Sequence, residues 1–446
     1  MAIGRPPVIS PSWLEPEAAS PLRYLYVLAV YLAAPLVSLM MLCRGFRDRS
    51  YWANFGERFG FGEALPPGSV WIHAVSVGEV QASAALVTTL RERYPAIPVL
   101  VTTLTPTGAT RAKSLFKDLA QVRYIPFDLP GAVRRFFNRV QPRLAVIFET
   151  ELWPNLYHQC GRRRIPLVLA SARISPRSVS RYRKLGSLFR DALSSGVVVA
   201  AQGEGDADRF KSLGADPDRT HVTGNIKFDF SVPFDLGERG RELRQFYAAA
   251  RPMWVAGSTH AGEEEIILEA QRIVRGSHPR ALLALVPRHP PRFEEVAHEL
   301  QQAGVRFARR SQHLGEKAGG VSAAAEVLLV DTLGELLDFY AASDVAFVGG
   351  SLVPIGGHNL LEPAALGLPI LTGPYTDNSA DIANLLIARG AAEVVHDAQE
   401  LGRGVSKLLS DPDERERIGA VGRSCVDSNR GALGKLLGLI EPLLRG

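Results

Sequence analysis

Acidic residues and one lysine follow apolar runs in the first half of the chain, where they could carry out acid–base chemistry. One run ends in the motif SVGE, which puts Glu79 near a helix start. Another ends in ETELWPN with Glu149 and Glu151, and GNIKFD further on contains Lys227. A glutamate can serve as a general base, and a lysine can neutralise a leaving phosphate. Structural roles are the alternative: complementing a helix dipole, capping the next helix, or pairing of the lysine with Asp229.

Four polar loops in the second half together predict a nucleotide site. They contain AGSTH, PRHP, DTLGEL and VGGSLVPIGGHNLLEP, and each follows a short apolar run. The second loop sets the fixed positive charge of Arg288 beside the imidazole of His289. In the last loop, glycines and Asn359 precede a helix, where free N–H groups and the helix dipole bind phosphate. Glu362, one turn into that helix, is placed to accept hydrogen bonds from ribose hydroxyls.

The sequence pattern predicts that the elements that position these residues are α/β units. From Val70 onward, short apolar runs alternate with segments of helical length, as expected of strands buried on both faces of a parallel sheet. The alternation lapses between Asp229 and Arg251 and then resumes. This pattern predicts two doubly wound, Rossmann-like domains that face one another across a cleft, with ligands beyond the carboxyl ends of the strands.

The domain boundaries follow from the same pattern. The apolar stretch Leu433–Leu444 is predicted to be a helix that packs across the domains or lies on a membrane surface. The predicted divisions are an N-terminal extension (1–23), a membrane helix (24–43), a first Rossmann-like domain (44–230), a linker (231–250) and a second Rossmann-like domain with the final helix (251–446).

The stretch Tyr24–Cys43 contains twenty residues without a charge and predicts a membrane helix. As a helix it would span about 30 Å, the thickness of the hydrocarbon core of a bilayer. Arginines at positions 44–49 outnumber those before the stretch, which predicts that the large C-terminal part is cytoplasmic. A removed signal peptide, a tilted or interfacial helix kinked at Pro35, and a buried hydrophobic hairpin are the alternatives.

Composition and missing motifs exclude several classes of protein. Lys and Arg total 51 against 46 for Asp and Glu, a net charge of +5 that is too small to indicate nucleic-acid binding. The three cysteines form no CxxC pair, which favours a reducing compartment. We find no P-loop, HExxH, DxD, GxSxG or GxGxxG motif, and we therefore predict neither a catalytic metal nor a cofactor. The basic segment Arg162–Lys184 could meet anionic lipid or a phosphorylated acceptor, or could be a solvated helix face.

The motifs, taken together and in order, resemble those of bacterial 3-deoxy-D-manno-octulosonic acid (Kdo) transferases. The resemblance runs from about Arg44 to Pro374. It implies a GT-B glycosyltransferase that inverts configuration and takes Kdo from CMP-Kdo. The implied acceptor is the tetraacylated, bis-phosphorylated disaccharide precursor of lipid A (lipid IVA), at the cytoplasmic face of the inner membrane. The activity would belong to the synthesis of the lipopolysaccharide inner core.

The resemblance also implies roles for individual residues. Glu79 matches the proposed general base, and we expect it to be ionised at pH 7 because an unperturbed glutamate has a pKa of about 4.3. Glu149 and Lys227 match residues associated with transition-state stabilisation. The sequence departs from the family in LGE, where MGE is frequent, and in NLLE, where NPLE is frequent. The residues that match CMP contacts are Arg288, His289, Leu333, Gly334, Glu335, Asn359, Leu360, Leu361 and Glu362.

Two other functions share some of these features. Another GT-B enzyme, such as a lipid A disaccharide synthase or a sugar-nucleotide epimerase, would have the same architecture but would use a UDP-sugar. A nucleotide-binding scaffold without activity is the second alternative, and the joint presence of Glu79, Glu149 and Lys227 argues against it. No motif encodes the number of Kdo residues transferred or the oligomeric state.

Overall fold

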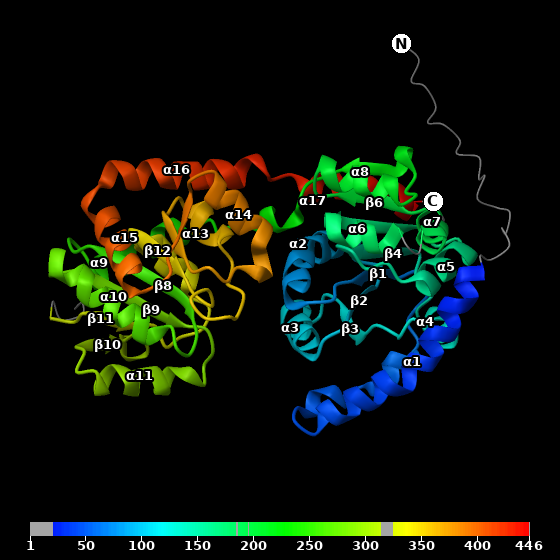
Figure 1. The fold of residues 1–446 in the computed structure, drawn as a ribbon, viewed down its shortest axis with the longest axis horizontal. Coiled ribbons are helices and arrows are strands. Elements are labelled where there is room, and N and C mark those ends of the chain that lie inside the picture. The colour runs from blue at the N-terminus through cyan, green and yellow to red at the C-terminus, as the bar shows by residue number, and fades with distance from the viewer. Residues whose placement is uncertain (1–20, 184–185, 195, 314–323, 446) are drawn as a thin grey trace, which may run out of the picture. The chain divides into compact units, whose positions relative to one another are not determined.

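The computed structural model describes residues 21–183, 186–194, 196–313 and 324–445. The chain divides into two compact units, the first formed by Met1–Phe230 with Arg430–Gly446 and the second by Ser231–Asn429. Figure 1 shows that each unit is a sheet covered by helices. Most of the predicted N-terminal extension lies outside the described residues.

The sheet of unit 1 has seven parallel strands in the order β3-β2-β1-β4-β5-β6-β7. The strands are β1 (Val70–His73), β2 (Val99–Thr103), β3 (Gln121–Tyr124), β4 (Leu144–Phe148), β5 (Leu167–Ala172), β6 (Val198–Ala201) and β7 (Thr220–Val222). The helices are α1 (Pro21–Gly45), α2 (Val77–Arg93), α3 (Pro106–Phe116), α4 (Pro130–Val140), α5 (Pro154–Arg162), α6 (Pro176–Arg183), α7 (Gly186–Ser194), α8 (Glu204–Ser212) and α17 (Ala432–Arg445).

The sheet of unit 2 is also parallel, in the order β10-β11-β9-β8-β12-β13-β14. Its strands are β8 (Met253–Thr259), β9 (Leu282–Pro287), β10 (Phe307–Arg309), β11 (Val327–Leu329), β12 (Val345–Val348), β13 (Ile370–Thr372) and β14 (Ala392–Val394). Its helices are α9 (Leu236–Tyr247), α10 (Glu264–Ser277), α11 (Arg292–Gln302), α12 (Leu336–Ala342), α13 (Leu361–Leu366), α14 (Ala380–Ala388), α15 (Ala398–Ser410) and α16 (Pro412–Ser428).

Both faces of each sheet are covered, which explains the continuous apolar runs in the sequence. Trp71 belongs to the hydrophobic cluster on one face of the first sheet, and its neighbour Ile72 belongs to the cluster on the other face. Successive side chains of a strand point to opposite faces, so a strand covered twice must be apolar at every position. The predicted fold class, α/β with two doubly wound parallel sheets and an N-terminal apolar helix, is confirmed.

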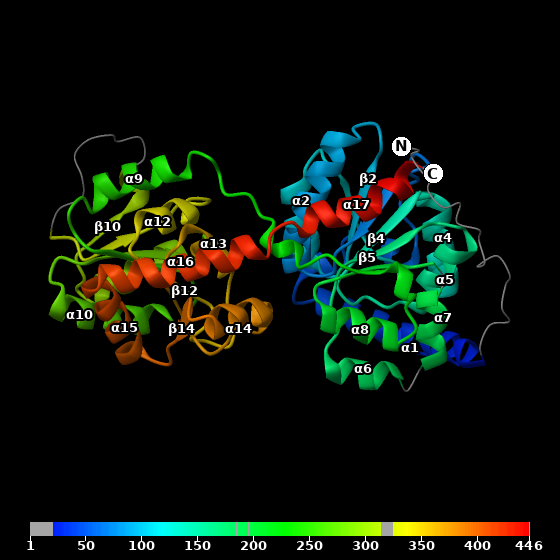
Figure 2. The same cartoon turned by 90° about the horizontal axis from the view of Figure 1, so that it is seen from above.

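The final helix belongs to unit 1, and the prediction that placed it in the second domain is wrong. Helix α17 lies along β5 and α2 of unit 1 (Figure 2), and its apolar stripe, which includes Leu436 and Ile440, belongs to the same hydrophobic cluster as Val168 and Ala170 of the first sheet. The guanidinium of Arg93 on α2 also pairs with a carboxylate of α17. The spacing of the stripe is visible in the sequence, but the sheet that it covers depends on the path of the chain after α16.

Asp229 fixes the start of this helix. One carboxylate oxygen accepts a hydrogen bond from the N–H of Gly431 at 2.6 Å, and the other accepts one from the N–H of Leu433 at 2.5 Å. Free N–H groups at a helix start are satisfied by such caps, which contribute about 1 kcal/mol each. The possible pairing of Lys227 with Asp229 is therefore not what the structure shows.

We expect Asp229→Ala to destabilise unit 1 because it removes both acceptors from the start of α17. The loss of a cap costs about 1 kcal/mol, which corresponds to a melting temperature about 3 °C lower in a unit of this size. Thermal unfolding followed by circular dichroism measures the shift. The exposed Asp118 provides a matched control, and an equal shift in Asp118→Ala would contradict the assignment.

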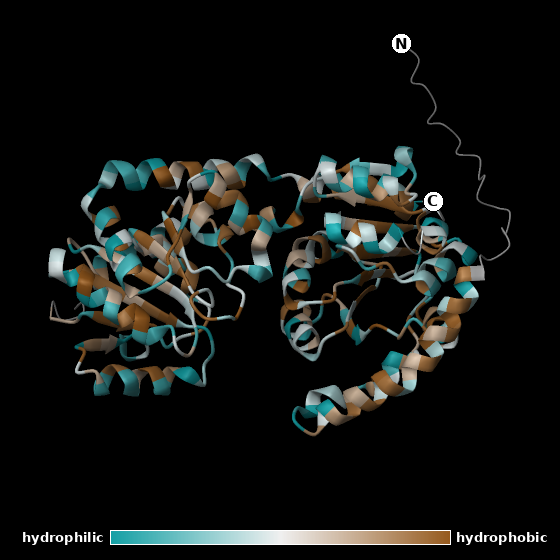
Figure 3. Ribbon diagram, viewed as in Figure 1, coloured by the Kyte–Doolittle hydropathy of each residue, from teal (hydrophilic) through white to brown (hydrophobic). Residues whose placement is uncertain are grey.

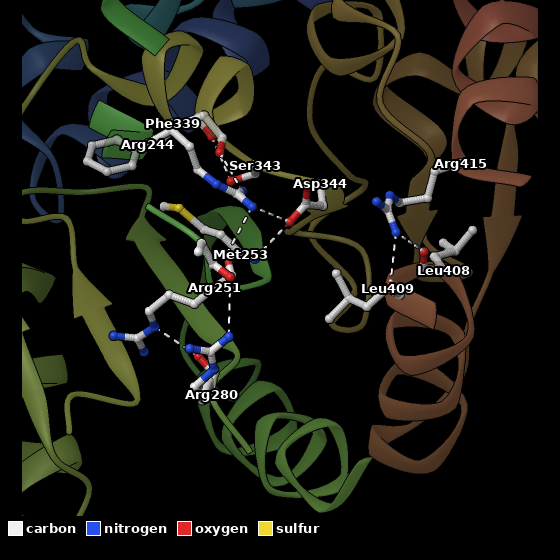
Figure 4. Close-up of polar contacts among 12 residues, drawn as sticks. Arg244, Arg251, Met253, Arg280, Phe339, Ser343, Asp344, Leu408, Leu409 and Arg415 are labelled. Carbon is white, nitrogen blue, oxygen red and sulfur yellow. Dashed lines mark hydrogen bonds and ion pairs between the residues drawn. The ribbon is translucent and has the colours of Figure 1, made fainter. Parts of the chain in front are cut away.

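The segment predicted to be a linker contains helix α9, which is bound to unit 2. The guanidinium of Arg244 donates to the carbonyl oxygens of Ala342 and Arg251 at 3.0 and 2.9 Å and pairs with Asp344 at 3.0 Å. Figure 4 shows Arg244 reaching from α9 to this carboxylate, which also accepts the N–H of Met253. The polar composition that suggested a linker is that of a surface helix with one buried side.

Helix α1 confirms the predicted N-terminal helix. Residues Leu22–Gly45 are long and apolar enough to cross a membrane, and an 18-residue window within them has a mean hydropathy of 2.2. Figure 3 shows the hydrophobic residues distributed along its length. The exposed side chains include Leu25, Leu32 and Leu36, which are 61 to 71% exposed. Tyr26 and Val27, by contrast, are partly buried, so the helix has one side against unit 1 and one exposed apolar side.

Candidate active site

The first group of candidate residues lies where the strand order of unit 1 reverses. Strands β1 and β4 are neighbours, and the chain continues from β1 toward one edge of the sheet and from β4 toward the other. Loops that leave such a switch point in opposite directions open a space for a ligand. Glu79 follows β1, and Glu149 follows β4, so the two predicted carboxylates lie at this position.

Glu79 is held in place by the start of helix α2. The hydroxyl of Ser76 donates to Oε1 at 2.9 Å, and the N–H of Val75 donates to Oε2 at 2.8 Å. Ser76 also accepts the N–H of Glu79 at 3.3 Å, so the pair forms a variant of the capping box. The side chain is only 8% exposed. Glu79 therefore has the structural role at a helix start that the sequence suggested. Because the residue is buried, however, ionisation of its carboxylate is energetically unfavourable.

Burial raises the pKa of Glu79 from its ordinary value of 4.5 to about 7, and the negative charges of Glu149 and Glu151 raise it further against the lowering effect of its hydrogen bonds. The expectation that Glu79 is fully ionised at pH 7 is therefore wrong. A group with a pKa near the working pH can both accept and release a proton, which is the property of an efficient general base.

We expect turnover to depend on pH through Glu79. Only the ionised carboxylate can accept a proton, and its pKa is about 7. The activity should therefore be low near pH 5.5, increase about tenfold per pH unit below the pKa, and level off above pH 8. Initial rates with saturating substrates between pH 5.5 and 9 measure the profile. A flat profile down to pH 5.5 would show that Glu79 is not the base or has an ordinary pKa.

Glu149 and Lys227 form an ion pair at the same edge of the sheet. The ammonium of Lys227 lies 2.9 Å from Oε1 of Glu149, and about a fifth of each side chain is exposed. Glu149 has a φ of 55°, in the left-handed region that residues other than glycine seldom adopt. Such strain is retained where the surrounding structure requires it, often at functional sites. The structure thus brings the three predicted catalytic residues to the carboxyl edge of one sheet.

Three neighbouring side chains shape this group. The indole N–H of Trp153 donates to Oε2 of Glu151 at 2.5 Å, and the ring of His73 lies edge-on to that indole. Burial lowers the pKa of His73 to about 4, so the imidazole is neutral. Its Nε2 atom has no hydrogen-bond partner among the described residues. Sequence reasoning did not single out His73, although one histidine in the strand VWIH was a visible signal.

Unit 2 has a corresponding switch point between β8 and β12, and Glu263 holds its two loops together. This fully buried carboxylate accepts the N–H groups of His260, Gly350, Ser351 and Leu352 at 2.7 to 3.0 Å. The loops approach so closely that a Cβ atom at position 349 would lie 2.8 Å from a backbone oxygen. Side chains that bind a ligand must be held within a fraction of an ångström, and the hydrogen bonds to Glu263 give these loops that rigid support.

Three histidines gather around these loops. The Nε2 atoms of His260 and His358 lie 2.8 Å apart, and the ring of His289 is edge-on to that of His260. Burial lowers the pKa of all three, that of His358 to about 4, and the positive charge of Arg288 acts in the same direction. Arg288 is exposed, and its guanidinium forms no hydrogen bond or ion pair with the described part of the chain. The loops therefore offer an unpaired cation beside neutral imidazoles, a suitable surface for a phosphate.

The other predicted nucleotide contacts differ in burial and in hydrogen bonding. Glu335 is paired with Arg310 at 2.7 Å, and hydrogen bonds from Arg310 and Thr332 outweigh its burial and lower its pKa. Leu333 is 72% exposed, and Gly334, with a φ of 88°, adjoins it. In the last loop, Asn359 donates to Glu362 and accepts the N–H of Leu361, next to the buried Leu360 at the start of the six-residue helix α13.

Solved structures identify the class of protein. The UDP-GlcNAc 2-epimerase of Neisseria meningitidis, bound to UDP-GlcNAc, has a TM-score of 0.54 and 15% identity, covering 85% of this chain and 100% of that chain. HepE of Anabaena in complex with UDP has a TM-score of 0.51 and 15% sequence identity, covering 84% of this chain and 99% of that chain. This likeness shows the fold, and with the two switch-point sites it defines a GT-B-type α/β protein.

Sequence comparison identifies the family. A family model described as 3-deoxy-D-manno-octulosonic-acid transferase (kdotransferase) matches residues 53–230. The 3-deoxy-D-manno-octulosonic acid transferase of Haemophilus influenzae is 41% identical, covering 95% of this chain and 99% of the relative, and that of Bordetella pertussis is 38% identical with the same coverage. The chain belongs to the Kdo transferase family. The C-terminal CMP-Kdo-binding domain of WaaA from Acinetobacter baumannii is 35% identical, with a TM-score of 0.40, covering 43% of this chain and 97% of that chain.

Proposed function

We propose that this protein transfers Kdo from CMP-Kdo to lipid IVA with inversion of configuration and releases CMP, as a step of lipopolysaccharide inner-core biosynthesis. The observation that carries the proposal is the buried Glu79 at the switch point of unit 1, close enough to Glu149 for that charge to raise its pKa. Membership of the Kdo transferase family supports the choice of sugar.

The transfer is a single displacement in this proposal. The acceptor hydroxyl bonds through its oxygen to the anomeric carbon of Kdo, and its proton moves to the carboxylate of Glu79. The bond from that carbon to the phosphate oxygen of CMP breaks, and its electron pair stays on the phosphate. Positive charge develops on the sugar, where the carboxylate of Glu149 stabilises it. Negative charge develops on CMP, where the cations Lys227 and Arg288 stabilise it. Because only one displacement occurs, the configuration at the anomeric carbon is inverted.

The nucleotide contacts belong to unit 2 in this proposal. The unpaired guanidinium of Arg288 binds the phosphate of CMP, with His289 beside it. The carboxylate of Glu362, oriented by Asn359 at 3.0 Å, accepts hydrogen bonds from the ribose. The exposed residues Leu333 and Gly334 contribute a backbone contact, and the remaining predicted contacts, Glu335, Leu360 and Leu361, shape the site.

The acceptor places the enzyme at a membrane. A lipid with four acyl chains stays in the bilayer, and α1 offers an apolar surface to the same bilayer. We propose that α1 anchors the protein at the inner membrane, with the catalytic units on the cytoplasmic side. The exposed Arg177 and Arg181 on α6 are available to acceptor phosphates or anionic lipid, whereas Lys184 of the same basic segment lies outside the described residues.

Turnover by the detergent-solubilised full chain tests the function. The protein is supplied with CMP-Kdo and lipid IVA, and mass spectrometry resolves the products. Products heavier by one or more Kdo units are expected, and their masses give the number of residues added. The absence of product from folded protein, combined with competition by UDP rather than CMP, would contradict the proposal and favour a UDP-sugar enzyme.

We expect Arg288→Ala to weaken the binding of CMP about 30-fold without lowering the thermal stability. A hydrogen bond to a charged group contributes about 1.5–3 kcal/mol, and the side chain of Arg288 is exposed, so its removal leaves no cavity. Isothermal titration calorimetry with CMP measures the change. The exposed Arg403 on α15 gives a matched control, and an equal loss of affinity in Arg403→Ala would show an effect of net charge instead.

A further inference from the structure

Asp128 is a buried carboxylate that the proposed reaction does not use. It follows β3, is 6% exposed, and receives three hydrogen bonds on its carboxylate. The N–H groups of Asn155 and Leu156 donate to it at 3.0 and 2.9 Å, and the hydroxyl of Tyr26 donates at 2.8 Å. The side-chain amide of Asn155 also donates to the backbone oxygen of Asp128 at 2.6 Å.

These contacts make Asp128 the cap of helix α5. The residue at the N-cap position, Trp153, supplies no capping hydrogen bond from its side chain. The free N–H groups at the start of the helix are instead satisfied by Asp128 from a different part of the chain. The first turn of α5 is therefore held in place by a contact between distant residues.

The start of α5 is also the end of the loop that carries two of the site carboxylates. Glu149 and Glu151 precede α5 by three to five residues. The hydroxyl of Tyr157 on α5 donates to the backbone oxygen of Glu151 at 3.0 Å, and Trp153 donates to its carboxylate. A displacement of the first turn of α5 thus moves the loop that faces Glu79.

Tyr26 connects the same carboxylate to helix α1. Its hydroxyl bonds to Oδ2 of Asp128, and five residues later the hydroxyl of Tyr31 accepts the N–H of Gly131 at 3.4 Å. Figure 1 shows α1 along the side of unit 1 that carries α4 and α5. The C-terminal end of α1 contacts the turn that follows it, where the indole of Trp52 donates to the backbone oxygen of Leu42 at 2.9 Å.

We propose that Asp128 is a positioning residue that couples the docking of α1, through Tyr26, to the placement of the Glu149–Glu151 loop. The hydroxyl of Tyr26 orients the Asp128 carboxylate, and the carboxylate holds the first turn of α5. Contact of the exposed apolar side of α1 with a membrane keeps the helix docked and the loop in its active position.

The coupling determines how α1 meets the bilayer. At a rise of 1.5 Å per residue, Tyr26 lies about 27 Å along the axis from Arg44. A helix that crossed the bilayer on its own would carry Tyr26 that far from the unit that contains Asp128. In the docked state α1 lies alongside unit 1, and its exposed stripe with Leu25, Leu32 and Leu36 faces the lipid.

Hydrogen exchange tests the coupling without reference to the reaction. The full chain in detergent micelles is compared with Tyr26→Phe, which removes one hydroxyl, and with Tyr24→Phe, which removes the hydroxyl of a 69% exposed tyrosine of the same helix. We expect the amides of Asn155 and Leu156 to exchange at least threefold faster in Tyr26→Phe and at the wild-type rate in Tyr24→Phe. Equal rates in all three proteins would overturn the proposal.

Kinetics with CMP-Kdo and lipid IVA test the positioning role, and this arm depends on the proposed function. We expect Tyr26→Phe to lower kcat about fivefold with an unchanged KM for CMP-Kdo, because the donor site is in unit 2. An unchanged kcat, or an equal loss in Tyr24→Phe, would overturn the role. If the wild-type protein shows no turnover, the proposed function fails, and hydrogen exchange alone decides whether α1 is coupled to the loop.

Discussion

The Glu79→Gln variant is expected to lose about 10³-fold in kcat while its affinity for CMP stays unchanged. The amide keeps nearly the volume of the carboxylate and can still accept the N–H of Val75, but it cannot take a proton from the acceptor hydroxyl. A positioned general base contributes about 10²–10⁴-fold to a reaction. Single-turnover rates with CMP-Kdo and lipid IVA measure the loss, and calorimetric titration with CMP measures binding.

The variant is expected to fold well. The pKa of Glu79 is about 7 in the folded protein and 4.5 in the unfolded chain. Between these two values Glu79 is protonated in the folded state but ionised in the unfolded state, so the free energy of unfolding of the wild type falls as the pH rises through this range. A glutamine does not have this cost, so Glu79→Gln should be at least as stable as the wild type at pH 8. Glu92→Gln, an exposed change on the same helix, is the control. Loss of CMP binding in folded Glu79→Gln would contradict the assignment.

Lys227→Ala is expected to lower kcat about 10²–10³-fold, the second largest effect. The ammonium stabilises the charge that develops on the leaving phosphate, and removal of one such group from a preorganised site costs about 3–4 kcal/mol. The change also leaves Glu149 without its partner at 2.9 Å. Steady-state kinetics with both substrates varied separate this loss from a change in KM.

A double-mutant cycle tests whether Lys227 and Glu149 act as a pair. Because the two side chains contact one another, the double variant Lys227→Ala/Glu149→Gln should be hardly slower than the slower single variant. Additive losses would mean that the two residues act independently. Lys113→Ala, at an exposed lysine of α3, controls for the loss of one positive charge.

The sequence was most informative about the ends of strands. A parallel sheet buried on both faces forces apolar runs, so the residues after β1 and β4 could be recognised as loop residues at the carboxyl edge. The candidate residues Glu79 and Glu149 follow directly. Strand β7, with three residues and little burial, was not predicted because its pattern is too short to distinguish from a loop.

The electrostatics of the site could not be read from the sequence. The pKa of Glu79 depends on burial beneath neighbouring loops and on the charges of residues about 70 positions away, none of which a local pattern contains. The same holds for Asp128, whose partners Tyr26 and Asn155 come from two distant segments. Glu263 was visible as one of three consecutive glutamates, but nothing in their spacing shows which one is buried.

The return of α17 to the first sheet has a consequence for how the protein is made. The apolar face of unit 1 that Leu436 and Ile440 cover is complete up to Phe230, but its covering helix begins at Ala432. At roughly 5–20 residues per second, a ribosome needs on the order of ten seconds or more to add the intervening residues. During that time the nascent unit exposes a hydrophobic surface, which favours aggregation until α17 docks.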